Sequence, residues 1–234
     1  MTELTWRSDM TVELDDFTGS DARIARIARV STKGKAGEAD AKADAGLINF
    51  LMRERHGSPF EHAVLSWYIE APIFVWREFM RHRIASYNEE SGRYRELEPV
   101  FYVPSEHRKL VQVGKAGRYE FREGTKDQRT EAVFGLMSTA TVGYSNYRNA
   151  LSEGVAREVA RMNLPLHIYS SAFVTMNARA LMNFLSLRTK REGAKFPSYP
   201  QREIEMVAEA METAFAFHLP QTYKAFSDNG RVAP

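Results

Sequence analysis

Helix-like and strand-like segments alternate along this chain of 234 residues, without the even spacing of a doubly wound parallel sheet. Strand patterns are expected at residues 12–14, 62–70, 93–103 and 166–175. Helical patterns are expected at residues 20–30, 38–56, 72–80, 127–152, 155–163, 177–187 and 202–217. A surface loop is expected over 104–125 and a loose tail over 228–234. This order predicts one mixed α+β domain over 1–234, with an antiparallel-type sheet flanked by helices.

The chain contains no cysteine, which excludes disulfides, thiolate zinc sites, iron–sulfur clusters and thiol nucleophiles. Its six histidines are scattered, and His56 and His62 stand six positions apart across a glycine and a proline, so no metal site is expected. No G-x-G-x-x-G or P-loop motif is present to hold phosphates in the standard nucleotide manner. Any chemistry must therefore use other side chains or a cofactor.

The basic residues are mostly arginine, with 23 Arg against 9 Lys, although the formal net charge is only +2. Arginine presents a planar fork suited to bidentate capture of phosphate or carboxylate. A GC-rich genome would also enrich arginine, and composition leaves both explanations open. The sequence shows no signal segment, and its most apolar stretch, 63–76, is too short to span a bilayer. A cytoplasmic protein is therefore expected.

Residues 81–94, R-H-R-I-A-S-Y-N-E-E-S-G-R-Y, are unusually rich in hydrogen-bonding side chains. A solvated loop with compensating charges is one explanation. A ligand site is favoured because His, Asn, Ser and Tyr offer hydrogen bonds without adding charge. Arg81 and Arg83 would point in nearly opposite directions at a helix end, and would then serve two different ligand groups.

Two downstream clusters also carry polar groups on helical patterns. Arg157 and Arg161 share a face at i,i+4 spacing, where surface salt pairing is the alternative to anion binding. Arg179 and Asn183 share a face of a mostly apolar helix, where unpartnered burial would be costly. A cofactor would supply partners for Arg179 and Asn183, and so would packing against another subunit.

The pattern R-H-R, then seven residues, then Ser at 81–91 resembles the signature of the flavin-dependent thymidylate synthases. The resemblance covers most of residues 20–190 and rests on several blocks in the same order. These blocks are A-R-V-S at 28–31, H-G-S-P-F-E-H at 56–62, A-P-I-F at 71–74, R-E-V-A-R-M-N-L-P at 157–165 and N-A-R at 177–179.

The resemblance implies an enzyme that makes dTMP from dUMP, with methylenetetrahydrofolate as the carbon donor. It implies FAD as the cofactor, reduced by NADPH and supplying the hydride. It also implies a homotetramer of mixed α/β fold whose FAD and dUMP sites form between subunits. Its partners would be these small molecules and further copies of the chain, with no nucleic acid and no membrane.

The family's functional residues carry over by position. FAD contacts would be Ser58, Arg81, His82, Arg83, Glu89, Asn177, Arg179 and Asn183. Contacts to dUMP would be Glu78, Phe79, Met80, Arg81, Glu89, Glu90, Ser91, Gly92, Arg93, Arg161 and Arg188. Arg188 would be catalytic, lying against the uracil ring and stabilising negative charge that develops there. Ser91 would bind dUMP rather than act as a nucleophile, since no base in the motif is placed to activate it.

One stretch departs from the family's pattern. Many relatives carry a histidine soon after the position of Arg188, whereas this chain has none before His218. A relative that binds flavin or nucleotide without turnover is therefore a second hypothesis. An arginine-rich RNA-binding module is a third, although no basic motif interleaved with aromatic residues supports it.

Overall fold

Two nine-residue strands, β3 (Val64–Pro72) and β8 (Tyr169–Asn177), lie at the centre of the main sheet. Leu65, Trp67 and Ile69 are fully buried at every second position of β3, as the two-residue period of a strand requires. The computed structural model describes residues 3–34, 41–115 and 118–234. It gives a four-stranded sheet in the order β2-β3-β8-β4, with β2 at Thr11–Thr18 and β4 at Ser86–Glu89.

The chain divides into two compact units. The first unit comprises Met1–Met10, Glu70–Phe79 and Glu89–Ala172, and the second comprises Thr11–Ile69, Met80–Asn88 and Phe173–Pro234. The chain passes from one unit to the other within β3, β4 and β8.

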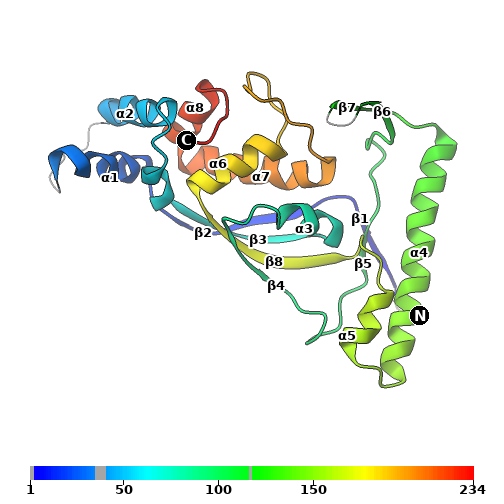
Figure 1. Cartoon of the computed structure of the whole chain (residues 1–234). Coiled ribbons are helices and arrows are strands. Elements are labelled where there is room, and N and C mark those ends of the chain that lie inside the picture. Colours follow the sequence, from blue (N-terminus) through cyan, green and yellow to red (C-terminus); the bar gives the residue numbers. More distant parts are fainter. Residues whose placement is uncertain (1–2, 35–40, 116–117) are drawn as a thin grey trace. The chain divides into compact units, whose positions relative to one another are not determined.

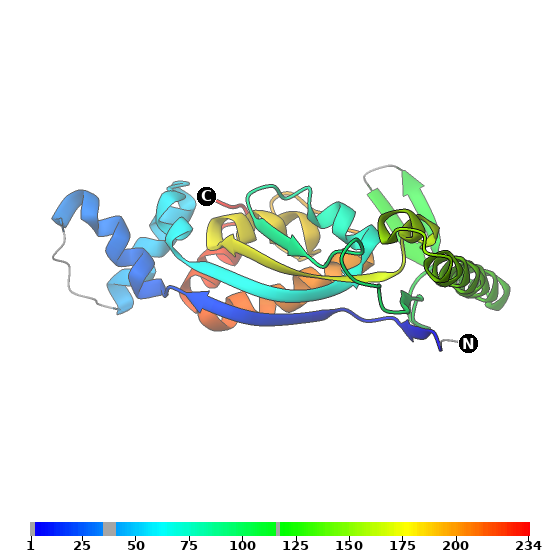
Figure 2. The same ribbon diagram turned by 90° about the horizontal axis from the view of Figure 1, so that it is seen from below.

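In the second unit, helices α6 (Ala178–Arg188) and α7 (Arg202–His218) lie along one face of the strands (Figures 1 and 2). Helix α6 starts where β8 ends because Asn177 Oδ1 accepts the N–H of Ala180 at 2.9 Å and caps the helix. The buried residues of both helices recur every three or four positions and form the apolar faces that pack together, among them Leu181, Phe184, Leu185, Val207, Met211 and Phe215.

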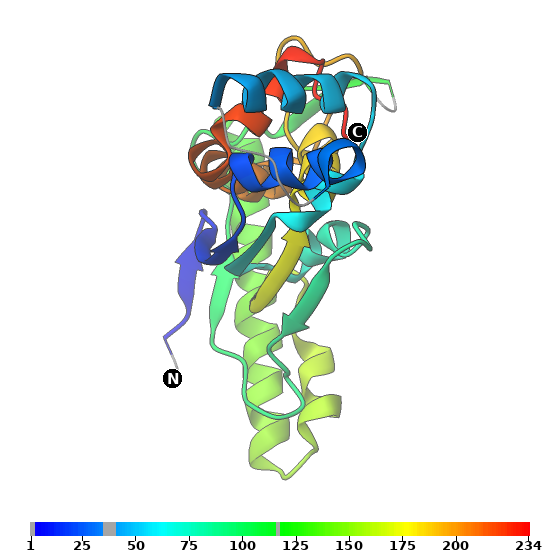
Figure 3. The same cartoon turned by 90° about the vertical axis from the view of Figure 1, so that its left-hand side faces the viewer.

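Helices α1 (Asp21–Lys33) and α2 (Ala41–Arg53) lie side by side in the same unit (Figures 1 and 3). The short helix η1 (Ser58–His62) packs on α1, and α8 (Pro220–Asp228) packs on α2. Asp21 links α1 to α8, since its carboxylate accepts the main-chain N–H groups of Gln221 and Thr222 at 2.9 and 3.0 Å. These are orphan donors of the first turn of α8, so Asp21 fixes where that helix starts.

The first unit is built around the 27-residue helix α4 (Lys126–Ser152). Helix α5 (Arg157–Ala160) and the short helix η2 (Arg161–Asn163) pack against it (Figure 3). Its remaining elements are α3 (Ile73–Phe79), the strand pair β1 (Thr5–Arg7) and β5 (Val100–Tyr102), and the hairpin strands β6 (Val111–Lys115) and β7 (Arg118–Arg122). Its core contains Leu97, Phe101, Tyr144, Tyr147 and Ile168. No helix in the described part of the chain is long and apolar enough to cross a membrane.

The predicted class, α+β with sheet flanked by helices, is confirmed, as are the helices at 127–152, 177–187 and 202–217. The sheets are mixed rather than purely antiparallel, because β1 and β5 pair in parallel.

The strand predicted at 93–103 is reduced to Val100–Tyr102, since the N–H groups of Tyr94 and Arg95 donate to Ser91 O and form a turn. The loop predicted at 104–125 contains the antiparallel pair β6–β7. The predicted helix at 155–163 is split into α5 and η2, and the start of the one predicted at 38–56 (38–40) lies outside the described residues.

The tail predicted to be loose at 228–234 is instead tied to the second unit. The Arg231 side chain is buried and pairs with Glu212 at 2.6 Å. Its main chain takes a left-handed φ of 57° directly after Gly230 at 74°, which turns the chain inward at the end of α8. The sequence prediction was wrong because the partner that anchors this segment lies 19 positions away on α7.

Candidate functional site

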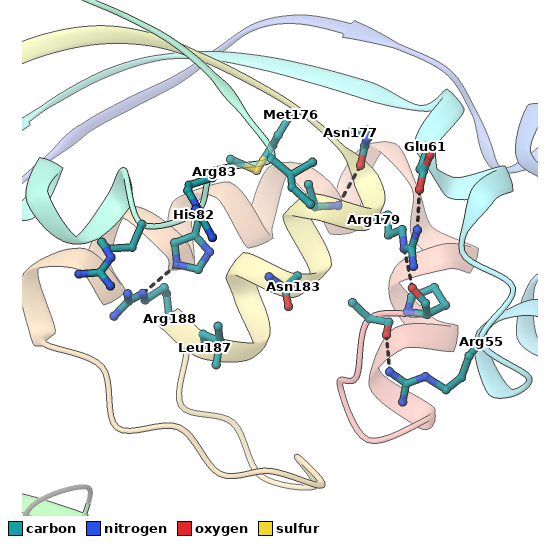
Figure 4. Close-up of a pocket in the computed structure, with 15 residues that line it drawn as sticks. Arg55, Glu61, His82, Arg83, Met176, Asn177, Arg179, Asn183, Leu187 and Arg188 are labelled. Atoms are coloured by element: carbon teal, nitrogen blue, oxygen red, sulfur yellow. Dashed lines mark hydrogen bonds and ion pairs between the residues drawn. The ribbon is translucent and has the colours of Figure 1, made fainter.

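A cavity of about 750 Å³ opens in the second unit between η1, the segment after α3, helix α6 and the last residues of the chain (Figure 4). Its lining is Arg55, Glu61, Arg81, His82, Arg83, Ile84, Met176, Asn177, Arg179, Ala180, Asn183, Leu187, Arg188, Ala233 and Pro234. The volume lies within the usual range for small-molecule sites.

The cavity is strongly basic. Five of the lining side chains are arginines, and Glu61 is the one carboxylate side chain among the described residues that line it. Glu61 is already paired, because Arg179 Nη1 donates to its Oε1 at 2.6 Å. The surplus of guanidinium groups favours a ligand with two or more negative charges.

Arg188 and His82 form the polar contact on one side of this cavity. Arg188 Nε donates to His82 Nε2 at 3.0 Å, and the His82 ring meets Phe184 edge-on with 4.8 Å between centroids. Burial, and then the charge of Arg188, lower the pKa of His82 to about 4. His82 is therefore neutral near pH 7, and its unprotonated nitrogen orients the guanidinium.

The segment carrying His82 is itself held in place. Tyr87 donates its hydroxyl hydrogen to the main-chain oxygen of His82 at 2.8 Å, and burial raises the pKa of Tyr87 to about 12. Helix α3 ends at Phe79, so Arg81 and Arg83 do not stand on a helix end. Both line this cavity, and the helix end on which their opposite directions were expected is absent from the described residues here.

Main-chain oxygens orient two further arginines on the opposite side of the cavity (Figure 4). Arg179 Nε donates to Pro234 O at 2.6 Å, and Arg55 Nη2 donates to Ala233 O at 3.1 Å. Gly57 makes room for this arrangement, because a Cβ there would lie 2.6 Å from Arg179 Cζ and 2.7 Å from Pro234 O. Arg179 and Asn183 share the cavity face of α6, as their spacing predicted.

A second group of predicted residues gathers in the first unit, around the turn at 89–93. Glu89 Oε1 accepts the Ser170 hydroxyl at 2.6 Å, and Ser91 Oγ accepts the N–H of Arg93 at 3.3 Å. Gly92 is buried, and a Cβ there would lie 3.3 Å from Arg161 Cδ, so the turn and η2 are in close contact. Two predicted residues, Ser91 and Arg161, are thereby held on neighbouring segments.

Comparisons with known proteins agree with the motif. The family described as "Thymidylate synthase complementing protein" matches residues 13–221. The chain belongs to this family.

A flavin-dependent thymidylate synthase from Streptomyces avermitilis is 56% identical over 235 residues, covering 98% of this chain and 96% of that protein. One from Tropheryma whipplei is 54% identical over 230 residues, covering 97% and 96%. A crystal structure of the UMP/dUMP methylase PolB from Streptomyces cacaoi, bound with 5-Br UMP, superposes with a TM-score of 0.93 at 49% identity and covers 100% of both chains.

The residues expected from thymidylate synthase family membership fall into two groups. Six of the eight expected FAD contacts line the cavity: Arg81, His82, Arg83, Asn177, Arg179 and Asn183. In the described structure Ser58 and Glu89 do not line it; Ser58 begins η1, and Glu89 belongs to the first unit. Arg188 also lines the cavity.

Most of the expected dUMP contacts lie in the first unit. They are Glu78, Phe79, Glu89, Glu90, Ser91, Gly92, Arg93 and Arg161, while Met80, Arg81 and Arg188 belong to the second unit. The Phe79 side chain is buried against Trp76. Arg93 pairs with Glu158 at 2.9 Å, and Glu90 Oε1 accepts the N–H of Ser171 at 3.0 Å.

Sequence reasoning missed several residues of the cavity. Arg55 precedes the family block at 56–62, and Glu61 lies inside it, but neither was singled out as a contact. Ala233 and Pro234 contribute main-chain oxygens, which every residue type carries, so no sequence signal marks them.

Proposed function

We propose that this chain is a flavin-dependent thymidylate synthase that makes dTMP from dUMP. The observation that carries the proposal is the arginine-rich cavity, which the R-H-R segment and α6 build together in a chain of this family. Its charge and its hydrogen-bonding groups are those that a dinucleotide cofactor and a nucleotide monophosphate require.

The cavity residues fit FAD. A diphosphate carries two negative charges, and Arg81, Arg83 and Arg179 offer guanidinium groups to neutralise them. Met176 and Leu187 supply apolar surface suited to a flat ring. We assign FAD binding to Ser58, Arg81, His82, Arg83, Glu89, Asn177, Arg179 and Asn183. When bound, FAD supplies the hydride chemistry, with NADPH as the reductant.

We assign the dUMP phosphate to the turn at 89–93 together with Arg161. Ser91 offers a hydroxyl, and Arg93 and Arg161 offer guanidinium groups, each of which forms charge-assisted hydrogen bonds to phosphate oxygens. Arg93 is exposed and its pair with Glu158 is exposed too, so exchanging that partner for a phosphate costs little.

Arg188 is the catalytic residue of the proposal. Its Nε–H donates to a neutral imidazole, which helps to orient the guanidinium. A guanidinium fixed beside the uracil ring stabilises negative charge that develops there during methylene transfer. The carbon donor in this proposal is methylenetetrahydrofolate.

We further propose a homotetramer with active sites formed between subunits. Two apolar side chains that line the cavity, Ile84 and Leu187, are 77% and 52% exposed in the single chain. Such surface is stabilised when another subunit covers it. The reaction's water-soluble substrates suit a cytoplasmic enzyme. Light scattering on the purified protein tests the assembly, and a monomer that retains full activity contradicts it.

The decisive experiment is a reconstituted assay. Purified protein should be yellow or bind added FAD, the bound flavin should be bleached by NADPH, and dTMP should form from dUMP and methylenetetrahydrofolate. A protein that does not bind flavin refutes the proposal. Flavin binding without dTMP formation indicates a binding protein, and RNA binding with a steep salt dependence and no flavin indicates the arginine-rich RNA module.

A second candidate is methylation of UMP as well as dUMP. It is favoured by the likeness to PolB, which is described as a UMP/dUMP methylase and matches this chain over its full length. The same assay with UMP in place of dUMP separates the two candidates. Methylation of UMP at a rate comparable to dUMP supports the second, and strict dependence on the deoxy substrate supports the first.

A further inference from the structure

Arg231 and Glu212 of α7 form a buried ion pair. Neither residue is among the described residues that line the cavity. Arg231 Nη2 lies 2.6 Å from Glu212 Oε1, and the two side chains are 4% and 5% exposed. The Tyr223 hydroxyl also donates to Glu212 Oε1, at 3.2 Å, and Arg191 Nη2 lies 2.8 Å from Glu212 Oε2. Burying both charges is costly, and an apolar pair of similar volume often stabilises a fold as well. Stability alone is therefore a weak reason for this pair.

The pair reaches the cavity first through Thr189. Arg231 Nη2 donates to Thr189 Oγ1 at 2.8 Å, and that hydroxyl donates to Leu185 O at 2.7 Å. Thr189 is buried and ends α6 directly after Arg188. The Ser198 hydroxyl, in the loop that follows, donates to Thr189 O at 2.6 Å. Thr189, the residue next to Arg188, is thus held by hydrogen bonds with Arg231, Leu185 and Ser198.

The pair reaches the cavity a second time through the main chain. Ala233 and Pro234 follow Arg231 closely in the chain. The main-chain oxygen of Ala233 accepts a hydrogen bond from Arg55, and that of Pro234 accepts one from Arg179. Arg231 holds this segment inward with a left-handed φ of 57°, a conformation that a non-glycine residue keeps only where its surroundings enforce it. The enforcing contacts are Glu212 and the Phe226 ring, 4.9 Å from the guanidinium carbon.

We propose that Arg231 is a positioning residue for the cavity: the buried Arg231–Glu212 pair anchors both the end of α6, which carries Arg188, and the segment whose oxygens orient Arg55 and Arg179. Three of the five cavity arginines thus depend on one ion pair. This inference rests on the proposed function, because its consequence is the placement of charge around FAD and dUMP.

The test uses Thr189→Val, Thr189→Ser and Arg231→Lys, with Lys224→Met as the matched control. Lys224 forms an exposed ion pair with Asp228 on α8, away from the cavity residues. FAD is titrated into flavin-free protein by fluorescence quenching, and kcat and KM for dUMP are measured at a temperature where every variant is folded.

Thr189→Val removes the two hydrogen bonds of the Thr189 hydroxyl, from Arg231 and to Leu185 O, and keeps the Arg231–Glu212 pair. The kcat should therefore fall about tenfold or more while the KM for dUMP and the FAD Kd change little. Thr189→Ser keeps the hydroxyl and should restore kcat. Arg231→Lys keeps the charge but loses the planar fork, so kcat should fall and the FAD Kd should rise, each by about tenfold. Lys224→Met should match the wild type.

Hydrogen–deuterium exchange on the flavin-free protein gives a readout that needs no activity. Arg231→Lys should speed exchange at 189–195 and 229–234, and Lys224→Met should not. Unchanged exchange at both segments overturns the inference whatever the protein's reaction is. If the wild type binds FAD and makes dTMP while Thr189→Val and Arg231→Lys match it, the inference fails and the proposed function stands. If Arg231→Lys does not fold, the Thr189→Val and Thr189→Ser pair carries the test.

Discussion

Arg188 Nε lies 3.0 Å from His82 Nε2, so a neutral imidazole takes part in orienting the proposed catalytic guanidinium. An unprotonated ring nitrogen accepts the hydrogen bond from Arg188 without adding a negative charge of its own. Burial enforces this state, because it lowers the pKa of His82 to about 4 together with the charge of Arg188.

The first prediction concerns pH. The folded pKa of His82 is lowered from an ordinary value of 6.5 to about 4, so the unfolded chain binds a proton there more readily than the folded one. The stability tied to neutral His82 is therefore fully present above pH 6.5 and is lost as the pH falls from 6.5 through about 4. Proton NMR should show His82 titrating near pH 4.

The control for this prediction is His82→Gln, whose amide oxygen can accept from Arg188 at every pH. The difference in melting temperature between wild type and His82→Gln should change between pH 6.5 and 4 and be flat above that range. A His82 resonance that titrates near 6.5 contradicts the assignment.

The second prediction separates two arginines of one cavity. Arg188→Ala should lower the kcat for dTMP formation by about a hundredfold or more, since it removes charge stabilisation of the transition state, and it should leave much of the FAD bound. Arg83→Ala should instead raise the FAD Kd by about tenfold or more, because it removes a charge-assisted hydrogen bond. Steady-state kinetics and FAD titration measure the two effects.

Arg26→Ala on the exposed face of α1 removes the same charge away from the cavity and should change neither quantity. Normal turnover by Arg188→Ala would show that its assigned role is wrong.

Elements with local signals could be predicted from the sequence. Helices α1 and α6 begin where expected, because Ser20 Oγ accepts from Arg23 N and Asn177 Oδ1 accepts from Ala180 N, three residues ahead in each case. Strand β5 could not be bounded, since its length depends on pairing with β1, far away in the sequence. Arg231, which follows the end of α8, was missed because its partner Glu212 lies on α7.

The candidate site also has features that could be predicted from the sequence and features that could not. The R-H-R segment and the Arg179–Asn183 spacing could be recognised from the sequence, and the fold brings their residues to the same cavity. The neutral state of His82 could not be predicted from the sequence, because burial and the neighbouring Arg188 lower its pKa only in the folded chain. Arg55 was missed too, since what orients it is a main-chain oxygen of Ala233.

The third prediction tests the space beside Arg179. Gly57 has an ordinary helical backbone, with φ −78° and ψ −28°, so alanine is conformationally allowed there. Its Cβ would nevertheless lie 2.6 Å from Arg179 Cζ and 2.7 Å from Pro234 O, and must displace one of them. Gly57→Ala should raise the FAD Kd about tenfold through loss of an oriented guanidinium.

Gly46→Ala on α2 is the matched control, since its Cβ would meet no described heavy atom within 4 Å beyond its chain neighbours and its own helix backbone. It should leave FAD binding unchanged and stabilise the fold by about 0.5–1 kcal/mol. Unaltered FAD binding in Gly57→Ala would mean that Arg179 is not needed in its present position.

The fourth prediction compares two glycines of helix α4. A Cβ at Gly143 would lie 2.6 Å from the main-chain oxygen of Asn163 and 3.2 Å from Pro165 Cδ, so α4 and η2 would have to move apart. Gly143→Ala should destabilise the protein by about 1–3 kcal/mol. Gly135→Ala, whose Cβ would meet no described heavy atom within 4 Å beyond its chain neighbours and its own helix backbone, should stabilise it by about 0.5–1 kcal/mol. Urea unfolding of both variants measures the opposite signs.

Gly143→Ala also tests the phosphate assignment, because η2 carries Arg161. If Arg161 binds the dUMP phosphate, the displaced η2 should raise the KM for dUMP more than it lowers kcat, while Gly135→Ala leaves both unchanged. FAD affinity is the internal control, since seven of its eight proposed contacts, all but Glu89, belong to the other unit. An unchanged KM in a Gly143→Ala protein that is measurably destabilised would remove Arg161 from the nucleotide site.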